Sequence, residues 1–189
     1  MSSKRSDSDD IITIQTESMC IDAVTNNGMA LKYVTKQTEA ICLAAVKNNG
    51  YALQFVLVQT NEICMEAIMN DCAAIQFVRA QTNEMCKYVV SMDGCNLQYV
   101  NAQTEEICMY ALTKCGYALQ SVKKQTESLC IAAVTNNGLA LQYVKVQTSA
   151  ICMAAVTNNG CALKYVLNKT SLICAAAVKN NGMALQYIV

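Results

Sequence analysis

The feature that most constrains this chain is a period of 22 residues that runs without insertion or deletion. Its marker is a threonine, at Thr16, Thr38, Thr60, Thr82, Thr104, Thr126, Thr148 and Thr170. A cysteine follows each of these threonines by four residues, and in seven of the eight repeats a glycine follows by twelve; the exception is Cys72. A fixed period of this length is typical of tandem duplication and predicts a stack of equal units.

Each repeat is predicted to contain two short helices. In the second repeat, Thr38 fits the N-cap of the first helix, and apolar residues at 41, 42, 45 and 46 form one helical stripe. Gly50 is expected to end this helix in the left-handed conformation. Apolar residues at 52, 53, 55 and 56 then form a second stripe about two turns long. The pattern therefore predicts helix, Asn-Asn-Gly turn, helix, tight turn.

These repeats predict an all-α fold, namely an α-solenoid of eight 22-residue helix-turn-helix repeats with about sixteen short helices. Ordering 22 residues costs about 1.5 kcal/mol each, more than the few large apolar side chains of one repeat recover, so each repeat must pack on its neighbours. A leucine-rich repeat has a similar period and is the alternative. A leucine-rich repeat requires apolar residues in alternation through its strand, whereas this chain has two consecutive alanines there, Ala44 and Ala45.

The domain organisation follows from the register of the repeats. Residues 11–189 are expected to form one solenoid domain that begins with a partial repeat at 11–15, and residues 1–10 a disordered charged tail. The chain start has no apolar segment typical of a secretory signal, and no run of about 18 apolar residues follows. We therefore expect an intracellular protein that is neither secreted nor bound to a membrane.

Charge is distributed unevenly along the chain. Residues 1–107 hold seven Lys/Arg and thirteen Asp/Glu, a net charge of −6, whereas residues 108–189 hold seven Lys and one acid, a net charge of +6. An elongated molecule would then carry an acidic end and a basic end. Neither end has the polar cap that solenoids normally need. These two features together suggest end-to-end self-association as a hypothesis.

No catalytic chemistry emerges from the sequence. The chain has no histidine, and it shows no nucleophile–base pair, phosphate-binding loop or cluster with metal-ligand spacing. We predict that it is not an enzyme and that it needs neither cofactor nor metal. The periodic cysteines are interpreted as small apolar side chains, because helices pack about 8–10 Å apart and disulfides need Cα atoms within about 7 Å.

Four cysteines depart from the periodic positions: Cys72, Cys95, Cys115 and Cys161. The first three fall at or beside the Asn-Asn-Gly turn of adjacent repeats. A labile thiol cluster is one interpretation of them, and free thiols in a reducing compartment are the favoured one.

Two further periodic columns are ambiguous. An aromatic residue recurs seventeen positions after the threonine, from Tyr33 to Tyr187, and is interpreted as core rather than as a platform for nucleobases. Glutamine precedes seven of the eight threonines. These glutamines are either a solvated face or a ladder between repeats, and their uniformity argues against sequence-specific RNA recognition.

Binding specificity is expected where repeats differ from one another, chiefly in repeats three to five and just after the turns. The candidate partner-binding residues are Lys87, Tyr88, Cys95, Tyr110, Tyr117 and Tyr51. Relaxed drift of the sequence is the alternative explanation for these differences. Candidate anion-binding residues in the basic half are Lys114, Lys123, Lys124 and Lys145. Solvated helix faces are the simpler interpretation of these lysines.

The motif A-V-x-N-N-G-x-A-L-Q-Y-V stands nearly intact at 45–56, 133–144, 155–166 and 177–188. It resembles the short helical repeats of a family of unknown function that is abundant in giant DNA viruses of amoebae, similar to mimivirus repeat proteins. The resemblance covers residues 16–189 and implies a helical repeat of unknown function, with no catalytic residues to carry over.

The function favoured by these observations is a non-enzymatic scaffold or adaptor for protein–protein interaction, in the host cytoplasm or virion if the protein is viral. The first alternative is a self-assembling structural component. The second is nucleic-acid binding through the basic C-terminal half.

Overall fold

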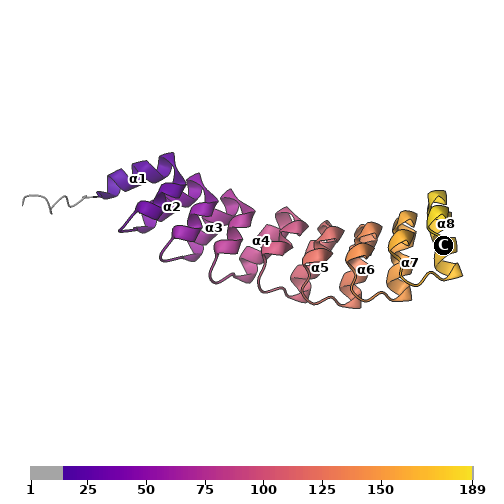
Figure 1. Ribbon diagram of the computed structural model, residues 1–189. Coiled ribbons are helices and arrows are strands. Elements are labelled where there is room, and N and C mark those ends of the chain that lie inside the picture. The colour runs from indigo at the N-terminus through magenta and orange to yellow at the C-terminus, as the bar shows by residue number, and fades with distance from the viewer. Residues whose placement is uncertain (1–14, 189) are drawn as a thin grey trace, which may run out of the picture. The chain divides into compact units, whose positions relative to one another are not determined.

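The computed structural model describes residues 15–188, so the tail expected at 1–10 and all but the last residue of the partial repeat lie outside the described residues. The described residues form eight α-helices that alternate with eight 3₁₀ helices, which confirms the all-helical solenoid (Figure 1). The α-helices are α1 (Glu17–Asn26), α2 (Glu39–Asn48), α3 (Asn61–Asn70), α4 (Asn83–Met92), α5 (Glu105–Lys114), α6 (Glu127–Asn136), α7 (Ser149–Asn158) and α8 (Ser171–Asn180). The 3₁₀ helices are η1 (Gly28–Tyr33), η2 (Gly50–Phe55), η3 (Cys72–Phe77), η4 (Gly94–Tyr99), η5 (Gly116–Ser121), η6 (Gly138–Tyr143), η7 (Gly160–Tyr165) and η8 (Gly182–Tyr187).

The chain divides into two compact units, of which the first ends at Asp71 and the second begins at Cys72. The first unit contains α1 to α3 with η1 and η2, and the second contains η3 to η8 with α4 to α8. Within each unit, each α-helix packs on the next α-helix and each 3₁₀ helix on the next 3₁₀ helix, which gives two layers. The boundary falls where cysteine replaces the turn glycine. A single domain over residues 11–189 stays a prediction.

Every α-helix begins at the threonine that marks the repeat. In α7, the Thr148 hydroxyl accepts a hydrogen bond from the Ile151 backbone N–H at 3.3 Å, and the other seven threonines cap their helices in the same way. An N-cap of this kind satisfies one of the backbone donors that the first helical turn leaves unpaired. The predicted N-cap is confirmed in all eight repeats.

The turn glycine does not act as expected. None of the described glycines has a positive φ, so the left-handed ending predicted for Gly50 is wrong. The residue before it, Asn49, is extended with φ −150° and ends α2. The glycine is required for close approach instead: a Cβ on Gly50 would lie 2.5 Å from the backbone oxygen of Ala67 in the following repeat.

The second helix of each repeat has the predicted two turns but is a 3₁₀ helix of six residues. At three residues per turn, six residues complete two 3₁₀ turns, which leaves room for the tight turn before the next threonine within the 22-residue period. Leu53 and Val56 of this segment are fully buried. In α2, Ile41 and Val46 keep at most 1% of their surface exposed.

The interpretation of the aromatic column as core is wrong. Phe55 and Tyr143 are only half-buried, and Tyr33 keeps 67% of its surface exposed. The core is made instead by the aliphatic residues on either side, such as Leu141 and Val144 around Tyr143. The aromatic rings therefore cover the edge of the core rather than fill it.

Candidate functional site

Glutamines that directly precede the repeat threonines join one repeat to the next. The Gln125 Nε2 donates to the Tyr143 carbonyl at 2.9 Å, and the Gln125 Oε1 accepts from the Lys145 backbone N–H at 3.0 Å. Five further glutamines make the same pair of bonds within their unit: Gln15, Gln37, Gln81, Gln103 and Gln147. The ladder interpretation of this column is confirmed, because each amide is occupied by the backbone of its neighbour.

The periodic cysteines lie beneath these glutamines. Cys130 is 3% exposed, and its thiol donates weakly to the Gln125 Oε1 at 3.7 Å. Burial raises the pKa of the Cys130 thiol, and the nearby Glu127 carboxylate raises it further. A buried thiol held in its neutral form is unreactive, so the column has a packing role.

A second joint between repeats was missed by sequence analysis. The Asn158 Oδ1 accepts from the backbone N–H of Gly138 in the preceding repeat at 2.7 Å, while its Nδ2 donates to the Thr135 carbonyl at 2.8 Å. The same clamp is made by Asn48, Asn70, Asn136 and Asn180. The recurrence of the first Asn in Asn-Asn-Gly was the available signal.

Two repeats lack the clamping asparagine. Met92 stands at this position in the fourth repeat and Lys114 in the fifth. Neither side chain can both accept from the glycine N–H and donate to the carbonyl as an amide does. The joint between the fourth and fifth repeats therefore lacks the clamp that Asn136 makes at the next joint, between the fifth and sixth repeats.

A pocket of about 550 Å³ opens at this joint, between α4 and α5. Three of its lining residues, Lys87, Tyr88 and Tyr110, are among the predicted partner-binding residues, and the structure brings them together. The remaining lining residues, which the sequence analysis did not select, are Glu84, Ser91, Glu106 and Ile107.

Charged and aromatic groups alternate around this α4–α5 pocket. The Lys87 Nζ forms an ion pair with the Glu106 carboxylate at 2.8 Å. Tyr110 is 41% exposed, and the Lys114 ammonium lies over its ring, 5.6 Å from the centroid. The lining of this pocket therefore offers apolar ring faces together with charged groups of both signs.

The other three predicted partner-binding residues do not line the pocket. Tyr51 belongs to the first unit, at the start of η2. Tyr117 packs edge-on against Tyr143, with ring centroids 5.9 Å apart. Cys95 lies at the start of η4, in a different group of side chains.

That group consists of Asp93, Cys95 and Cys115, whose ligating atoms all lie within 4.8 Å of one another. Burial, the adjacent Cys115 thiol and the Asp93 carboxylate together raise the pKa of Cys95 to about 12. Two of the three cysteines that the sequence placed near adjacent turns therefore meet, and all twelve cysteines are free thiols.

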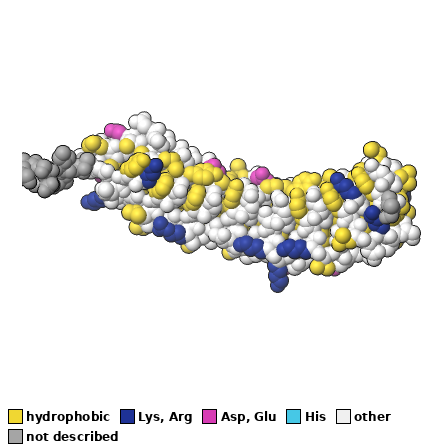
Figure 2. Space-filling view, in the orientation of Figure 1, with side chains coloured by type: hydrophobic (Ala, Val, Ile, Leu, Met, Phe, Trp, Pro, Cys, Tyr) yellow, Lys and Arg dark blue, Asp and Glu magenta, His cyan; other side chains and the backbone are white. Residues whose placement is uncertain are grey.

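The predicted anion-binding lysines divide into separate sites. Lys123 and Lys145 line one hollow of about 350 Å³, and Lys123 and Lys124 line another of about 360 Å³. Glu127 shares the first hollow and Glu105 the second, so each basic group faces an acid. Lys114 lines neither hollow. On the face shown in Figure 2, the basic side chains form scattered spots rather than a continuous patch.

Comparison with known protein families finds a similarity in the first two repeats. Residues 16–59, which hold the first two repeats, match a family described as Domain of unknown function (DUF4116). Neither a curated protein nor a solved structure matches the chain. No helix within residues 15–188 combines the length and apolar character needed to cross a membrane. The chain is thus a helical repeat protein whose first two repeats are similar to a family of unknown function.

Proposed function

We propose that this chain is a non-enzymatic scaffold that binds a partner protein through the α4–α5 pocket. The observation that carries this proposal is the pair Tyr88 and Tyr110. Both occupy the position six residues after the threonine, where the second, sixth, seventh and eighth repeats have alanine. Two adjacent repeats thus present tyrosine into one hollow. Neither ring belongs to the buried core.

The chemistry of the wall suggests what the partner presents. Tyrosine is enriched at interface hot spots because its ring contributes contact area while its hydroxyl stays hydrated. The lining residues carry two carboxylates, Glu84 and Glu106, against the one ammonium of Lys87, which already pairs with Glu106. We therefore expect a protein segment with an apolar or aromatic anchor beside a basic side chain.

Affinity purification of the tagged, nuclease-treated chain from its natural host cell, with mass spectrometry, tests this function. The key variant is Tyr88→Ala/Tyr110→Ala, which restores the residue of the regular repeats and should fold normally. We expect it to lose a partner that the wild type retains. Tyr117→Ala is the control, since Tyr117 lies outside the pocket. A partner retained equally by both variants would rule out this binding site.

The resemblance of the A-V-x-N-N-G-x-A-L-Q-Y-V motif to giant-virus repeats supports a narrower setting, which we also propose: a viral protein that acts in the host cytoplasm or in the virion. Quantitative mass spectrometry of infected amoebae and of purified virions tests it. Absence of the protein from both samples would contradict this setting.

A second candidate function is self-assembly through apolar faces that the first and eighth repeats leave exposed. Leu185 is 63% exposed in the last repeat, whereas the equivalent Leu163 is fully buried by the repeat that follows it. In the first repeat, Met19 is 61% exposed, whereas the equivalent Ile41 is 1% exposed. These apolar faces resemble the internal joints, so a second copy is a suitable occupant.

Light scattering of the purified chain at low and high salt distinguishes this candidate. Self-assembly predicts a mass that rises with concentration and falls to that of one chain in the Leu185→Lys variant. A strict monomer under all conditions would exclude it.

Nucleic-acid binding is the least supported candidate, because Glu105 and Glu127 share the hollows of the basic side chains. Binding to unrelated nucleic acids should then weaken steeply with salt. No binding at about 50 mM salt would exclude this function.

A further inference from the structure

We propose that Asp93, Cys95 and Cys115 form a Zn²⁺ site that clips the fourth repeat to the fifth. Asp93 and Cys95 lie at the turn between α4 and η4, and Cys115 lies at the next turn, between α5 and η5. The site is separate from the α4–α5 pocket, since none of its three residues lines that pocket.

The geometry suits a tetrahedral cation. Zn²⁺ binds thiolates at about 2.3 Å and carboxylate oxygens at about 2.0–2.2 Å, so its ligand atoms lie roughly 3.5–4 Å apart. The three ligand atoms here are already within 4.8 Å of one another. Small side-chain rotations would therefore complete three protein ligands, and water would take the fourth position. Two thiolates favour Zn²⁺ over the hard cations Mg²⁺ and Ca²⁺.

The sequence reaches this arrangement by departing from its own repeat. The position of Cys115 is asparagine in five of the eight repeats, and the position of Cys95 is more often Met, Tyr or Leu. The departure at Cys115 removes a hydrogen bond: Asn159 caps η7 by accepting from the Cys161 N–H at 3.0 Å, whereas Cys115 makes no side-chain cap of η5. Packing alone gives no reason for that loss, and metal ligation does.

Asp93 keeps the capping role while facing the thiols. Its Oδ1 accepts from the Cys95 backbone N–H at 2.8 Å, which holds the carboxylate on the turn beside both sulfur atoms. Ligating carboxylates are commonly oriented by hydrogen bonds of this kind.

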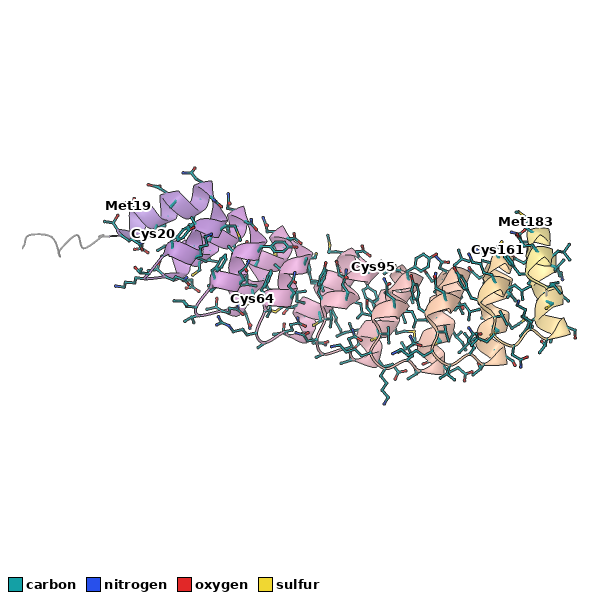
Figure 3. The ribbon with its side chains drawn as sticks, viewed as in Figure 1. Met19, Cys20, Cys64, Cys95, Cys161 and Met183 are labelled. Atoms are coloured by element: carbon teal, nitrogen blue, oxygen red, sulfur yellow. The ribbon has the colours of Figure 1, made fainter. Side chains whose placement is uncertain are left out.

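The same chain contains a matched site without the ligands. Cys161 is the equivalent of Cys95 in the seventh repeat, and the two lie at the same end of their repeats in Figure 3. Asn181 of the next repeat donates to the Cys161 sulfur at 3.4 Å, so these two positions are in direct contact. There the carboxylate is replaced by Asn159 and the second thiol by Asn181, which leaves one metal-ligating group.

A metal clip would also compensate for the missing asparagine clamp. The fifth repeat has Lys114 where the clamping asparagine stands elsewhere, so the fourth and fifth repeats lose two amide hydrogen bonds. A bond from Zn²⁺ to each repeat replaces them at the neighbouring residue, Cys115.

Titration of the reduced, metal-free full-length chain with Co²⁺, followed by Zn²⁺ competition, tests the site. We expect one equivalent of Co²⁺ with thiolate-to-metal charge-transfer absorption, displaced by one equivalent of Zn²⁺. Zn²⁺ should also raise the melting temperature. Cys115→Asn and Cys95→Met, which restore residues of other repeats, should abolish the absorption. Asp93→Asn should weaken affinity at least about tenfold.

A gain-of-function variant makes the test independent of any folding defect. Asn159→Asp/Asn181→Cys places the three ligand types around Cys161 and should bind a second equivalent of Co²⁺. Cys152→Ala, which removes a buried periodic thiol, should leave the stoichiometry at one. Co²⁺ bound without thiolate absorption, or equal thiolate absorption in folded Cys115→Asn, would overturn the proposal.

Discussion

The fourth and fifth repeats and the sixth and seventh repeats belong to the same unit but are joined in different ways. Between the sixth and seventh, the amides of Asn158 and Gln147 tie one backbone to the next, and the position of Tyr88 is held by the small Ala132 and Ala154. Between the fourth and fifth, the asparagine clamp is replaced by Lys114, and a pocket and a thiol cluster appear. Positions that keep the repeat sequence thus hold the repeats together, whereas this joint combines a lost clamp with departures from the repeat at Tyr88, Tyr110, Cys95 and Cys115.

The largest effect is expected from Gly138→Ala in the joint between the sixth and seventh repeats, which we call the regular joint. Its Cβ would lie 2.4 Å from the Ala155 backbone oxygen, which cannot move away without separating the repeats. We expect a loss of about 3 kcal/mol in the free energy of unfolding, measured by urea denaturation. Gly182→Ala is the control, because its Cβ meets nothing within 4 Å. Equal losses in both variants would show that the close approach is not the cause.

Replacing the residue at the clamping position should destabilise the regular joint and stabilise the joint between the fourth and fifth repeats, which we call the irregular joint. Asn158→Ala removes both amide bonds of the regular joint and leaves the Gly138 N–H without its acceptor, at a cost of about 2 kcal/mol. Lys114→Asn should install the clamp in the irregular joint and stabilise it by about 1 kcal/mol. Hydrogen exchange at Gly138 and Gly94 would report each joint separately. A destabilising Lys114→Asn would mean that this joint cannot accommodate the amide.

The buried thiols should make stability depend on alkaline pH. Burial raises the pKa of Cys152 above its usual 9.0. Above about pH 9 the native chain keeps a proton that the unfolded chain releases. The contribution of this thiol to stability is therefore fully present below about pH 9 and is lost as the pH rises through the native pKa. Urea midpoints at pH 8 and 10 should fall less for Cys152→Ala than for the wild type. Equal falls would contradict a shifted thiol at this position.

The smallest effect is expected at the ion pair of the irregular joint. Lys87→Met introduces the residue found at this position in the third, fifth and seventh repeats. The Lys87 and Glu106 side chains are 47% and 71% exposed, and exposed pairs contribute little. We expect a change below about 0.5 kcal/mol in urea denaturation, together with altered partner capture. A large loss of stability would assign Lys87 to the stack instead.

Local features of the fold were readable from the sequence, whereas features that depend on the neighbouring repeat were not. The threonine N-caps depend on residues three apart and were predicted correctly. Gly50 was misassigned because its constraint comes from Ala67 in the next repeat, not from its own φ. The same limit explains why the Asn158 clamp was missed, since its partners lie 20 and 23 residues away.

The candidate site was predicted in part for the same reason. Tyr88 and Tyr110 stand out against alanine in most other repeats, so comparison between repeats located them. Glu106 carried no such signal, because glutamate stands at the same position in the third and fourth repeats, and its contact with Lys87 required the packing of α4 against α5. Asp93 escaped notice because aspartate replaces asparagine conservatively as a cap, and only its distance to two thiols distinguishes it.

The Asn-Gly pairs of the turns also bear on how the protein ages. Asparagine deamidates fastest before glycine, because the glycine nitrogen attacks the side-chain amide to form a succinimide. In the clamped joints that nitrogen is committed: the Gly138 N–H, next to Asn137, donates to Asn158 at 2.7 Å. The stacking of repeats therefore protects the clamped Asn-Gly pairs from deamidation. At Gly182 no neighbouring atom lies within 4 Å of the position that a Cβ would take, so we expect Asn181, which precedes it, to deamidate first.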